Sequence, residues 1–357
     1  ATADRRRVRA LMVIMPLALV LLAVPSLMQE LNAARAEERH LEQHPAATVP
    51  VTAVGTIAMT VADMSRALDF YTRVLPFTVV SDTEQAGREF ELQSGVFGAR
   101  ARTVTLRLGD ETLALVEYLA PRGRPFPDDF RPNDAAFQHI AIIVSDMDGA
   151  YARLRESGVV HGSTGPQRLP DWNPNAGGIR AFYFRDPDRH FLEILQFPEG
   201  KGAPQWHRRD ALFLGIDHTA IVSMDTDCSL AFYRDLLHLS IAGESENFDS
   251  EQEHLNNVFG ARLRITSLRA VAGPGIELLE YLAPRNGRPL AADVAANDVV
   301  HWQTTVRTSA DLGIVPWLAR QHRLTLISPS PTVVTGDVQP AITVRDPDGH
   351  ALRLLQQ

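Results

Sequence analysis

The chain has 357 residues, 45% of them hydrophobic, so it can bury a sizeable core in roughly two domains. Its formal net charge is −8, from 43 acidic and 35 basic residues, and no basic stripe interleaves with aromatic residues, which argues against nucleic acid as a partner. The single cysteine, Cys228, excludes a disulfide framework within the chain and a cysteine cluster for zinc.

An apolar segment lies near the start of the chain. Four arginines between positions 5 and 9 precede an uncharged run at 10–28, ALMVIMPLALVLLAVPSLM. As a helix this run would measure about 28 Å, close to the thickness of a bilayer core. We expect residues 1–50 to form a membrane anchor and linker, with the arginines in the cytoplasm and the rest of the chain in the periplasm or another extracytoplasmic space.

A cleaved secretory signal peptide is the alternative for the same segment, and it leads to the same compartment. With a retained anchor, the membrane itself is a partner through the N-terminal helix, and a membrane protein could be a further one.

Beyond residue 50, four units repeat one order of predicted elements: a strand, a helix and three more strands. The first unit shows this order. Its predicted elements are the strand 54–61, the helix 64–75 and the strands 77–81, 103–108 and 112–119.

The units are also duplicated in pairs. The motif VFGAR at 96–100 recurs at 258–262, and EYLAPR at 117–122 recurs at 280–285. We therefore divide the chain into a first module pair at 51–200 and a second at 201–357.

Two positions in each unit carry polar residues where metal chemistry could occur. The first position lies on the first strand, for example in QHIAIIV and DHTAIV, and is occupied in chain order by Thr56, His139, His218 and His301. The second lies on the last strand and is occupied by Glu117, Glu193, Glu280 and Arg353. A carboxylate on a buried sheet face is costly without a cation or hydrogen bonds. Imidazole and carboxylate are suitable ligands for divalent Zn, Ni, Co, Mn or Fe.

The repeated strand–helix–strand–strand–strand order, the DHTAIV and QHIAIIV strands, the FYRDLL helix and the DPDGH turn resemble the vicinal oxygen chelate superfamily. This superfamily includes glyoxalase I, bleomycin-resistance proteins and extradiol dioxygenases, and the resemblance covers nearly everything from 51 to 357. It implies an α+β fold in which four βαβββ modules pair into two cupped, eight-stranded mixed sheets, here preceded by the N-terminal hydrophobic helix. It also implies one divalent metal ion inside a cup, held by both positions of two paired modules.

The pairing of modules decides which cup is complete. If neighbours pair, one with two and three with four, neither cup has a full ligand set. Resemblance to single-chain, four-module glyoxalases instead favours two with three and one with four. The predicted metal site is then made by His139, Glu193, His218 and Glu280. The other cup would hold Thr56, Glu117, His301 and Arg353, with an Arg353–Glu117 ion pair in place of a metal.

The resemblance implies chemistry on a small molecule that chelates the metal through adjacent oxygens. Four protein ligands favour an isomerase or lyase in which Glu193 or Glu280 leaves the metal to move a proton. A ring-cleaving dioxygenase more typically uses two histidines and one carboxylate. The competing hypothesis is a non-catalytic, membrane-anchored binding or accessory subunit, which the predicted anchor and the incomplete second cup favour.

Overall fold

The computed structural model describes residues 47–321, 324–334 and 339–357. Residues from Thr48 to Gln357 form one compact unit. The hydrophobic helix expected at 10–28 lies outside the described residues and stays a prediction. Within the described ranges, no helix is long and apolar enough to cross a membrane.

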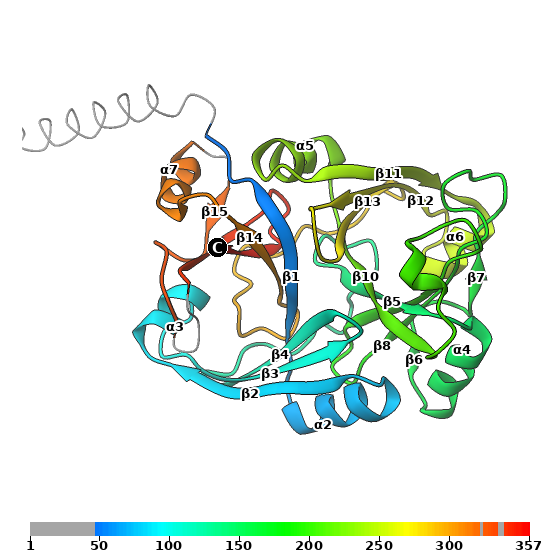
Figure 1. Ribbon diagram of the computed structural model, residues 1–357, viewed down its shortest axis with the longest axis horizontal. Coiled ribbons are helices and arrows are strands. Elements are labelled where there is room, and N and C mark those ends of the chain that lie inside the picture. The colour runs from blue at the N-terminus through cyan, green and yellow to red at the C-terminus, as the bar shows by residue number, and fades with distance from the viewer. Residues whose placement is uncertain (1–46, 322–323, 335–338) are drawn as a thin grey trace, which may run out of the picture. The chain divides into compact units, whose positions relative to one another are not determined.

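Two large mixed sheets form the compact unit (Figure 1). Sheet A takes its strands from the first and fourth modules: β1 (Val51–Thr60), β2 (Thr78–Ala86), β3 (Arg100–Leu108), β4 (Glu111–Ala120), β14 (Trp302–Thr308), β15 (Thr325–Leu326), β16 (Ala341–Arg345) and β17 (Ala351–Gln356). Their order is β15-β16-β17-β14-β1-β4-β3-β2.

Sheet B takes its strands from the second and third modules: β5 (Gln138–Val144), β6 (Val160–His161), β7 (Gln167–Arg168), β8 (Arg180–Arg185), β9 (Phe191–Gln196), β10 (Phe213–Val222), β11 (Ser240–Asn247), β12 (Arg262–Arg269) and β13 (Gly275–Ala283). Their order is β11-β12-β13-β10-β5-β9-β8-β6, and β7 pairs with β8 as a ninth strand. The α+β class and the two mixed sheets predicted from the sequence are therefore confirmed. The second module pairs with the third, and the first with the fourth.

Helices follow the first strand of every module. They are α2 (Met64–Asp69) with η1 (Phe70–Val74), α4 (Met147–Glu156), α5 (Thr226–Leu230) with η3 (Ala231–Leu236), and η4 (Leu312–Ile314) with α7 (Val315–Arg320). An aspartate precedes each one and accepts a hydrogen bond from a backbone N–H of the first turn, which fixes where the helix begins. The remaining helices are α3 (Arg88–Ser94), η2 (Pro204–His207) and α6 (Asp249–Asn256).

Successive side chains along a strand point to opposite faces, so each sheet has a core face and a cup face. Ile140 and Ile142 of β5 belong to a buried cluster that also contains Ile57 and Met59 of β1. Burying such side chains contributes about 1.5–3 kcal/mol each. The residues that alternate with them on β5, His139 and Ala141, must therefore point to the opposite face of sheet B.

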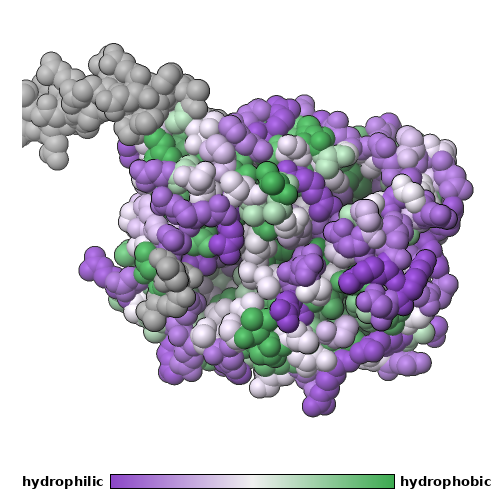
Figure 2. Space-filling model, viewed as in Figure 1, coloured by the Kyte–Doolittle hydropathy of each residue, from purple (hydrophilic) through white to green (hydrophobic). Residues whose placement is uncertain are grey.

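Polar contacts hold consecutive modules together although they belong to different sheets. The Tyr71 hydroxyl of the first module donates to Asp186 of the second at 3.1 Å, and Tyr233 of the third donates to Asp346 of the fourth at 2.9 Å. Asp186 also lies 2.9 Å from Nδ1 of His190. Figure 2 shows that apolar residues on the visible face are scattered among polar ones, so no continuous apolar surface dominates this view.

Candidate metal centre

The cup face of sheet B lines a cavity of about 680 Å³. Central strands β5 and β10 run antiparallel, with Ala220 opposite His139 and Ala141 opposite His218. Directly opposite residues share a face of the sheet, so both imidazoles lie on the cup face, with their ring centroids 6.1 Å apart. The sequence-based prediction that these two histidines meet in one cup agrees with the structure.

Three of the four predicted ligands converge. One ligand atom from each of His139, Glu193 and His218 lies within 4.8 Å of the others, and all three residues are buried. Oε2 of Glu193 lies 3.3 Å from Nε2 of His139 and 3.9 Å from Nε2 of His218. The parallel pairing of β5 with β9 produces this arrangement, because it places Glu193 beside Ala141, two residues beyond His139.

Glu280, the fourth predicted ligand, does not join this cluster. Its Oε2 accepts the backbone N–H of Thr226 at 3.2 Å, and its Oε1 lies 3.6 Å from Arg285. Thr226 is the first residue of α5, where a carboxylate is favoured by the helix dipole. The assignment of Glu280 as a ligand needs correction, because the odd spacing of three residues from Glu277 places the two side chains on opposite faces of β13.

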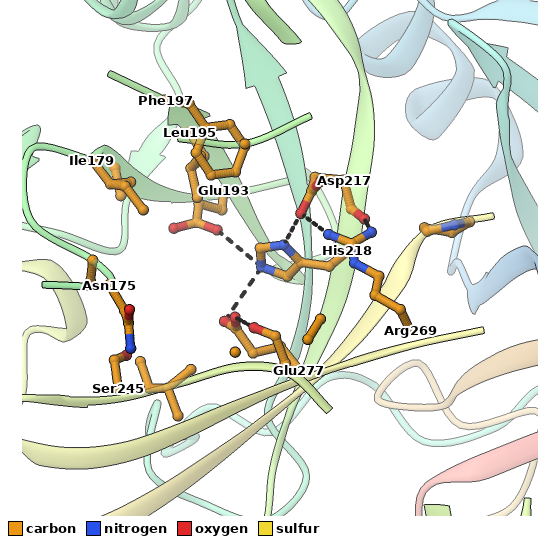
Figure 3. Close-up of a pocket in the computed structure, with 18 of the residues that line it drawn as sticks. Asn175, Ile179, Glu193, Leu195, Phe197, Asp217, His218, Ser245, Arg269 and Glu277 are labelled. Carbon is orange, nitrogen blue, oxygen red and sulfur yellow. Dashed lines mark hydrogen bonds and ion pairs between the residues drawn. The ribbon is translucent and has the colours of Figure 1, made fainter. Parts of the chain in front are cut away.

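Glu277 occupies the place that was predicted for Glu280. Its Oε2 lies 3.5 Å from Nε2 of His218, and its Oε1 accepts a hydrogen bond from Ser267 at 2.6 Å. β13 pairs with β10 so that Glu277 lies beside Ala220, two residues beyond His218. This register repeats that of Glu193 in the second module. Glu193 and Glu277 flank the imidazole of His218 on two sides (Figure 3).

A bulge in β10 places Asp217 beside its neighbour His218 on the cavity wall, since the register shifts between Ile216 and His218. Oδ2 of Asp217 lies 2.9 Å from Nδ1 of His218. The carboxylate also accepts hydrogen bonds from Trp206 at 2.8 Å and from Arg269 at 2.6 Å. Burial would raise the pKa of Asp217, but the hydrogen bond with His218 and the charge of Arg269 hold this pKa below its ordinary value.

The Asp217 contact determines which nitrogen of His218 faces the cavity. Neutral His218 donates from Nδ1 to Asp217, which leaves the Nε2 lone pair directed toward two carboxylates. Burial alone would lower the pKa of His218, but Glu277 and Asp217 outweigh it and raise this pKa to about 9. The site therefore favours a positive charge at Nε2, supplied either by a proton or by a metal ion.

The donor set fits a divalent metal. Nε2 of His218 and both ring nitrogens of His139 are buried and have no hydrogen-bond partner in the structure. Such groups are costly to bury unless a cation or hydrogen bond satisfies them. Two imidazoles and a carboxylate are ligands that Zn, Fe, Mn, Co and Ni accept. Among the described residues, no other trio of histidine, cysteine and acidic side chains comes together in this way.

Among the residues that the structure describes, the corresponding cup of sheet A does not bring a ligand set together. The pairing of β1 with β4 matches Thr56 to His218 and Ala114 to Glu277. The pairing of β14 with β17 matches Gln303 to His139 and Arg353 to Glu193. Thr56 contacts Thr112 through their hydroxyls at 2.7 Å. The first-strand position of the fourth module thus belongs to Gln303, and the assignment of His301 to it was wrong by two residues.

His301 and Glu117 have other roles. His301 is buried immediately before β14, where burial lowers its pKa to about 3. Glu117 lies 3.4 Å from the backbone N of Met64 and 3.4 Å from Arg122, which repeats the contacts of Glu280 with α5 and Arg285. The predicted replacement of a metal by an Arg353–Glu117 pair is not what the structure shows, because Glu117 faces helix α2.

A signal for Glu277 was present in the sequence. Glu193 and Glu277 are each the third residue of the last strand of their module, counted from Phe191 and Gly275. Aligning the modules by strand start instead of by the EYLAPR motif would have selected Glu277. Asp217 and Trp206 carried no such signal, because their roles depend on a bulge and on a segment that precedes the strand.

Comparison with known proteins agrees with this geometry. The family model of the Glyoxalase/Bleomycin resistance protein/Dioxygenase superfamily matches twice, over residues 53–194 and 215–354. The chain therefore belongs to this superfamily.

Individual relatives add detail. A 2-epi-5-epi-valiolone epimerase from an Actinomyces species is 36% identical over 156 residues, which span 42% of this chain and 81% of that protein. The structure of glyoxalase I from Zea mays aligns over 88% of this chain and 95% of its own, with 14% identity and a TM-score of 0.55. A putative dioxygenase from Bacillus subtilis aligns over 86% of both chains, with 15% identity and a TM-score of 0.53. These two structures are similar in fold.

Proposed function

We propose that this protein is a divalent-metal-dependent enzyme that moves a proton on a small molecule with adjacent oxygen atoms, as an epimerase or isomerase does. One observation carries the proposal: buried imidazole nitrogens without hydrogen-bond partners converge with Glu193, and Glu193 and His218 line a cavity of about 680 Å³. A perturbed ionisable group in a cleft is a recognised sign of an active site.

His139, Glu193 and His218 would hold the metal ion. When bound, the ion supplies a Lewis acid that polarises the carbonyl oxygen of a substrate and stabilises negative charge there. Asp217 keeps the Nε2 lone pair of His218 directed at the site through its contact with Nδ1. Trp206 and Arg269 hold Asp217 in turn.

Glu277 would be the proton carrier. It is outside the three-residue ligand cluster, and its side chain is 18% exposed, against 5% for Glu193, so it can reach a bound molecule. Its carboxylate would take a proton from the carbon next to a carbonyl. The C–H electron pair then forms a carbon–carbon double bond while the carbonyl π pair moves onto oxygen.

Return of the proton completes the reaction without a further reactant. Return to the neighbouring carbon gives an isomer once the adjacent hydroxyl proton has moved to the former carbonyl oxygen, and return to the opposite face of the same carbon gives an epimer. An epimerase therefore needs an acid on each side of the substrate. Glu193 would be the second acid after leaving the metal: it and Glu277 lie on two sides of His218 (Figure 3), and the epimerase relative supports this version of the reaction.

A ring-cleaving dioxygenase is the second candidate, and the composition of the ligand cluster favours it. His139, Glu193 and His218 are the two histidines and one carboxylate that non-haem iron oxygenases use, with other positions open. Oxygen consumption with catechols by the iron-loaded protein, and no proton exchange with hydroxyketones, would select this reaction over the first.

Metal analysis of the purified full chain tests the proposal. We expect one divalent ion per chain in the wild type and a loss of that ion in His139→Asn and His218→Asn. Gln303→Asn, at the matching position of sheet A, is the control and should retain the ion. Thermal melting of each variant shows whether it is folded. A folded wild type that binds no divalent ion would overturn the proposal and leave the binding-subunit hypothesis.

We also propose, from the sequence of residues 5–28, that the chain is tethered to a membrane with its modules outside the cytoplasm. Cell fractionation followed by protease treatment of intact spheroplasts tests this. Protection of the modules from the protease would contradict it.

A further inference from the structure

The charges of the cavity limit what it can bind. Carboxylates dominate its walls: the acidic residues Glu111, Glu193, Asp217, Glu244 and Glu277 line it, and Arg269 is the one lysine or arginine among the described lining residues. Glu244 is partly neutralised by Arg264, whose Nη2 lies 3.4 Å from it. The other four carboxylates, against one guanidinium and a divalent ion, leave a net charge of −1.

Arg269 is occupied within the wall. Its Nη2 donates to the carboxylate of Asp217 at 2.6 Å, and its Nη1 donates to the backbone oxygen of Asp217 at 2.8 Å. Its charge is thus compensated before any ligand enters. Phosphate and carboxylate groups in proteins are held by arginine or lysine, and an unpaired buried anion is costly. The described part of the cavity offers an anionic group no uncompensated cation.

Part of the cavity wall comes from sheet A. Glu111 begins β4 of sheet A, and its Oε2 accepts the backbone N–H of Ile216 in β10 at 3.0 Å. The β3–β4 turn packs closely there, since a Cβ at Gly109 would lie 2.5 Å from the Leu214 oxygen. Sheet A therefore adds a further carboxylate to the cavity of sheet B, which makes the site richer in hydrogen-bond acceptors.

The rest of the wall combines neutral polar groups with apolar surface. Asn175 and Ser245 lie across the cavity from His218, while Ile179 and Phe197 form an apolar side (Figure 3). Tyr183 and Trp206 add two further aromatic rings. The acceptors and amides of the wall can form hydrogen bonds with hydroxyl groups of a ligand. The aromatic faces can pack against the C–H groups of a compact carbon skeleton.

We propose that the ligand of this cavity is an uncharged, hydroxyl-rich ketone or aldehyde without phosphate or carboxylate groups. This rests on the proposed function, because the carbonyl and its neighbouring oxygen would face the metal centre. The hydroxyl groups would donate to the carboxylate and amide oxygens of the wall, and the aromatic residues would contact the carbon skeleton.

Matched ligand pairs test the charge preference. The probes are dihydroxyacetone and D-fructose, their phosphates (dihydroxyacetone phosphate and fructose 6-phosphate), and 1-amino-1-deoxyfructose as a cationic analogue. Dissociation constants are measured by NMR titration of the full, metal-loaded chain. Each neutral compound should bind at least about tenfold more tightly than its phosphate, because like charges across an interface are strongly disfavoured.

A variant with an added cation gives the matched control. Gln205 lies exposed on the cavity wall, so Gln205→Arg should reduce or reverse the discrimination against phosphate. Gln357→Arg adds the same charge at the exposed last residue and should leave the preference unchanged.

Three results would overturn the substrate class: tighter binding of the phosphates, tighter binding of the amine, or no binding of any neutral compound at about 10 mM. Metal content is measured on the same samples. A protein that holds one divalent ion but prefers the phosphates refutes only the substrate class, whereas a protein that holds no ion refutes the proposed function.

Discussion

The same substitution should have a large effect at one glutamate of strand β13 and almost none at another. Glu277→Gln removes a negative charge whose Oε2 lies 3.5 Å from Nε2 of His218. Glu280→Gln removes a charge from the other face of the strand, where the amide oxygen can still accept the N–H of Thr226. The pair separates the function of Glu277 from the general effect of losing a carboxylate on β13.

The magnitude follows from this distance. At 3.5 Å and an effective dielectric constant of about 20, two unit charges interact by about 5 kcal/mol before solvent screening. In the metal-free protein, Glu277→Gln should therefore shift the pKa of His218 from about 9 toward its ordinary value. In the metal-loaded protein, losing a general base should slow proton transfer by about 10²–10⁴-fold.

Deuterium exchange measures the catalytic effect without knowledge of the natural substrate. Metal-loaded protein is incubated with a neutral hydroxyketone in D₂O, and loss of the C–H signal beside the carbonyl is followed by proton NMR. We expect Glu280→Gln to exchange at a rate within about twofold of wild type, because residue 280 lies on the face of β13 opposite Glu277 and the glutamine oxygen can still accept the N–H of Thr226. The reasoning is refuted if Glu280→Gln abolishes exchange and Glu277→Gln does not.

Three further predictions concern the metal and the fold. Asp217→Asn should weaken metal affinity about 10–100-fold in a chelator competition, since the carboxylate orients His218; unchanged affinity would contradict that role. Removing the ion with a chelator should lower the melting temperature of wild type, because an ion at 100 times its Kd adds about 2.7 kcal/mol; His218→Asn should show no such decrease. Burial would lower the pKa of His190, but Asp186 outweighs it and raises this pKa above its ordinary value. Protonated His190 therefore stabilises the fold fully below the unfolded pKa of about 6.5, and the contribution is lost as pH rises through the folded pKa. His190→Gln should remove this pH-dependent part of the unfolding free energy in urea denaturation, and an unaltered profile would contradict the contact.

Much of the architecture could be read from the sequence because each module repeats the same hydrophobic pattern. The β5 segment QHIAIIV alternates a core face with a cup face, so His139 on the cup face followed from strand periodicity once the strand was located. Pairing of the second module with the third came from resemblance to four-module glyoxalases. The structure supports it through the antiparallel register of β5 and β10.

The site residues were assigned wrongly where the modules were aligned by a sequence motif and not by strand register. The EYLAPR repeat correctly equated Glu117 with Glu280, but both of these glutamates contact the N-terminus of a helix. A local similarity of sequence cannot show on which face of a strand a side chain lies unless the start of the strand is known. The same problem led to His301 instead of Gln303, because the offset between matching residues grows from 162 at VFGAR to 163 at EYLAPR and 164 at this strand, whereas the prediction used 162.

Some contributions to the site are tertiary and had no local signal. Asp217 reaches the cavity only because β10 bulges beside it. Glu111 reaches it from sheet A, and Trp206 from η2. Glu111 and Trp206 lie far from the site in the sequence, and Asp217 lies at an irregular point of its strand. Only the packing of the folded chain brings the three residues to the same wall.

Anomalous diffraction from crystals of the Mn²⁺-loaded full chain would test the metal site most directly. We predict one strong peak between the side chains of His139, Glu193 and His218, close to Glu277, and no peak beside Gln303 and Arg353. A peak in the sheet A cup, or a well-ordered sheet B cup without a peak, would contradict the assignment of the metal centre.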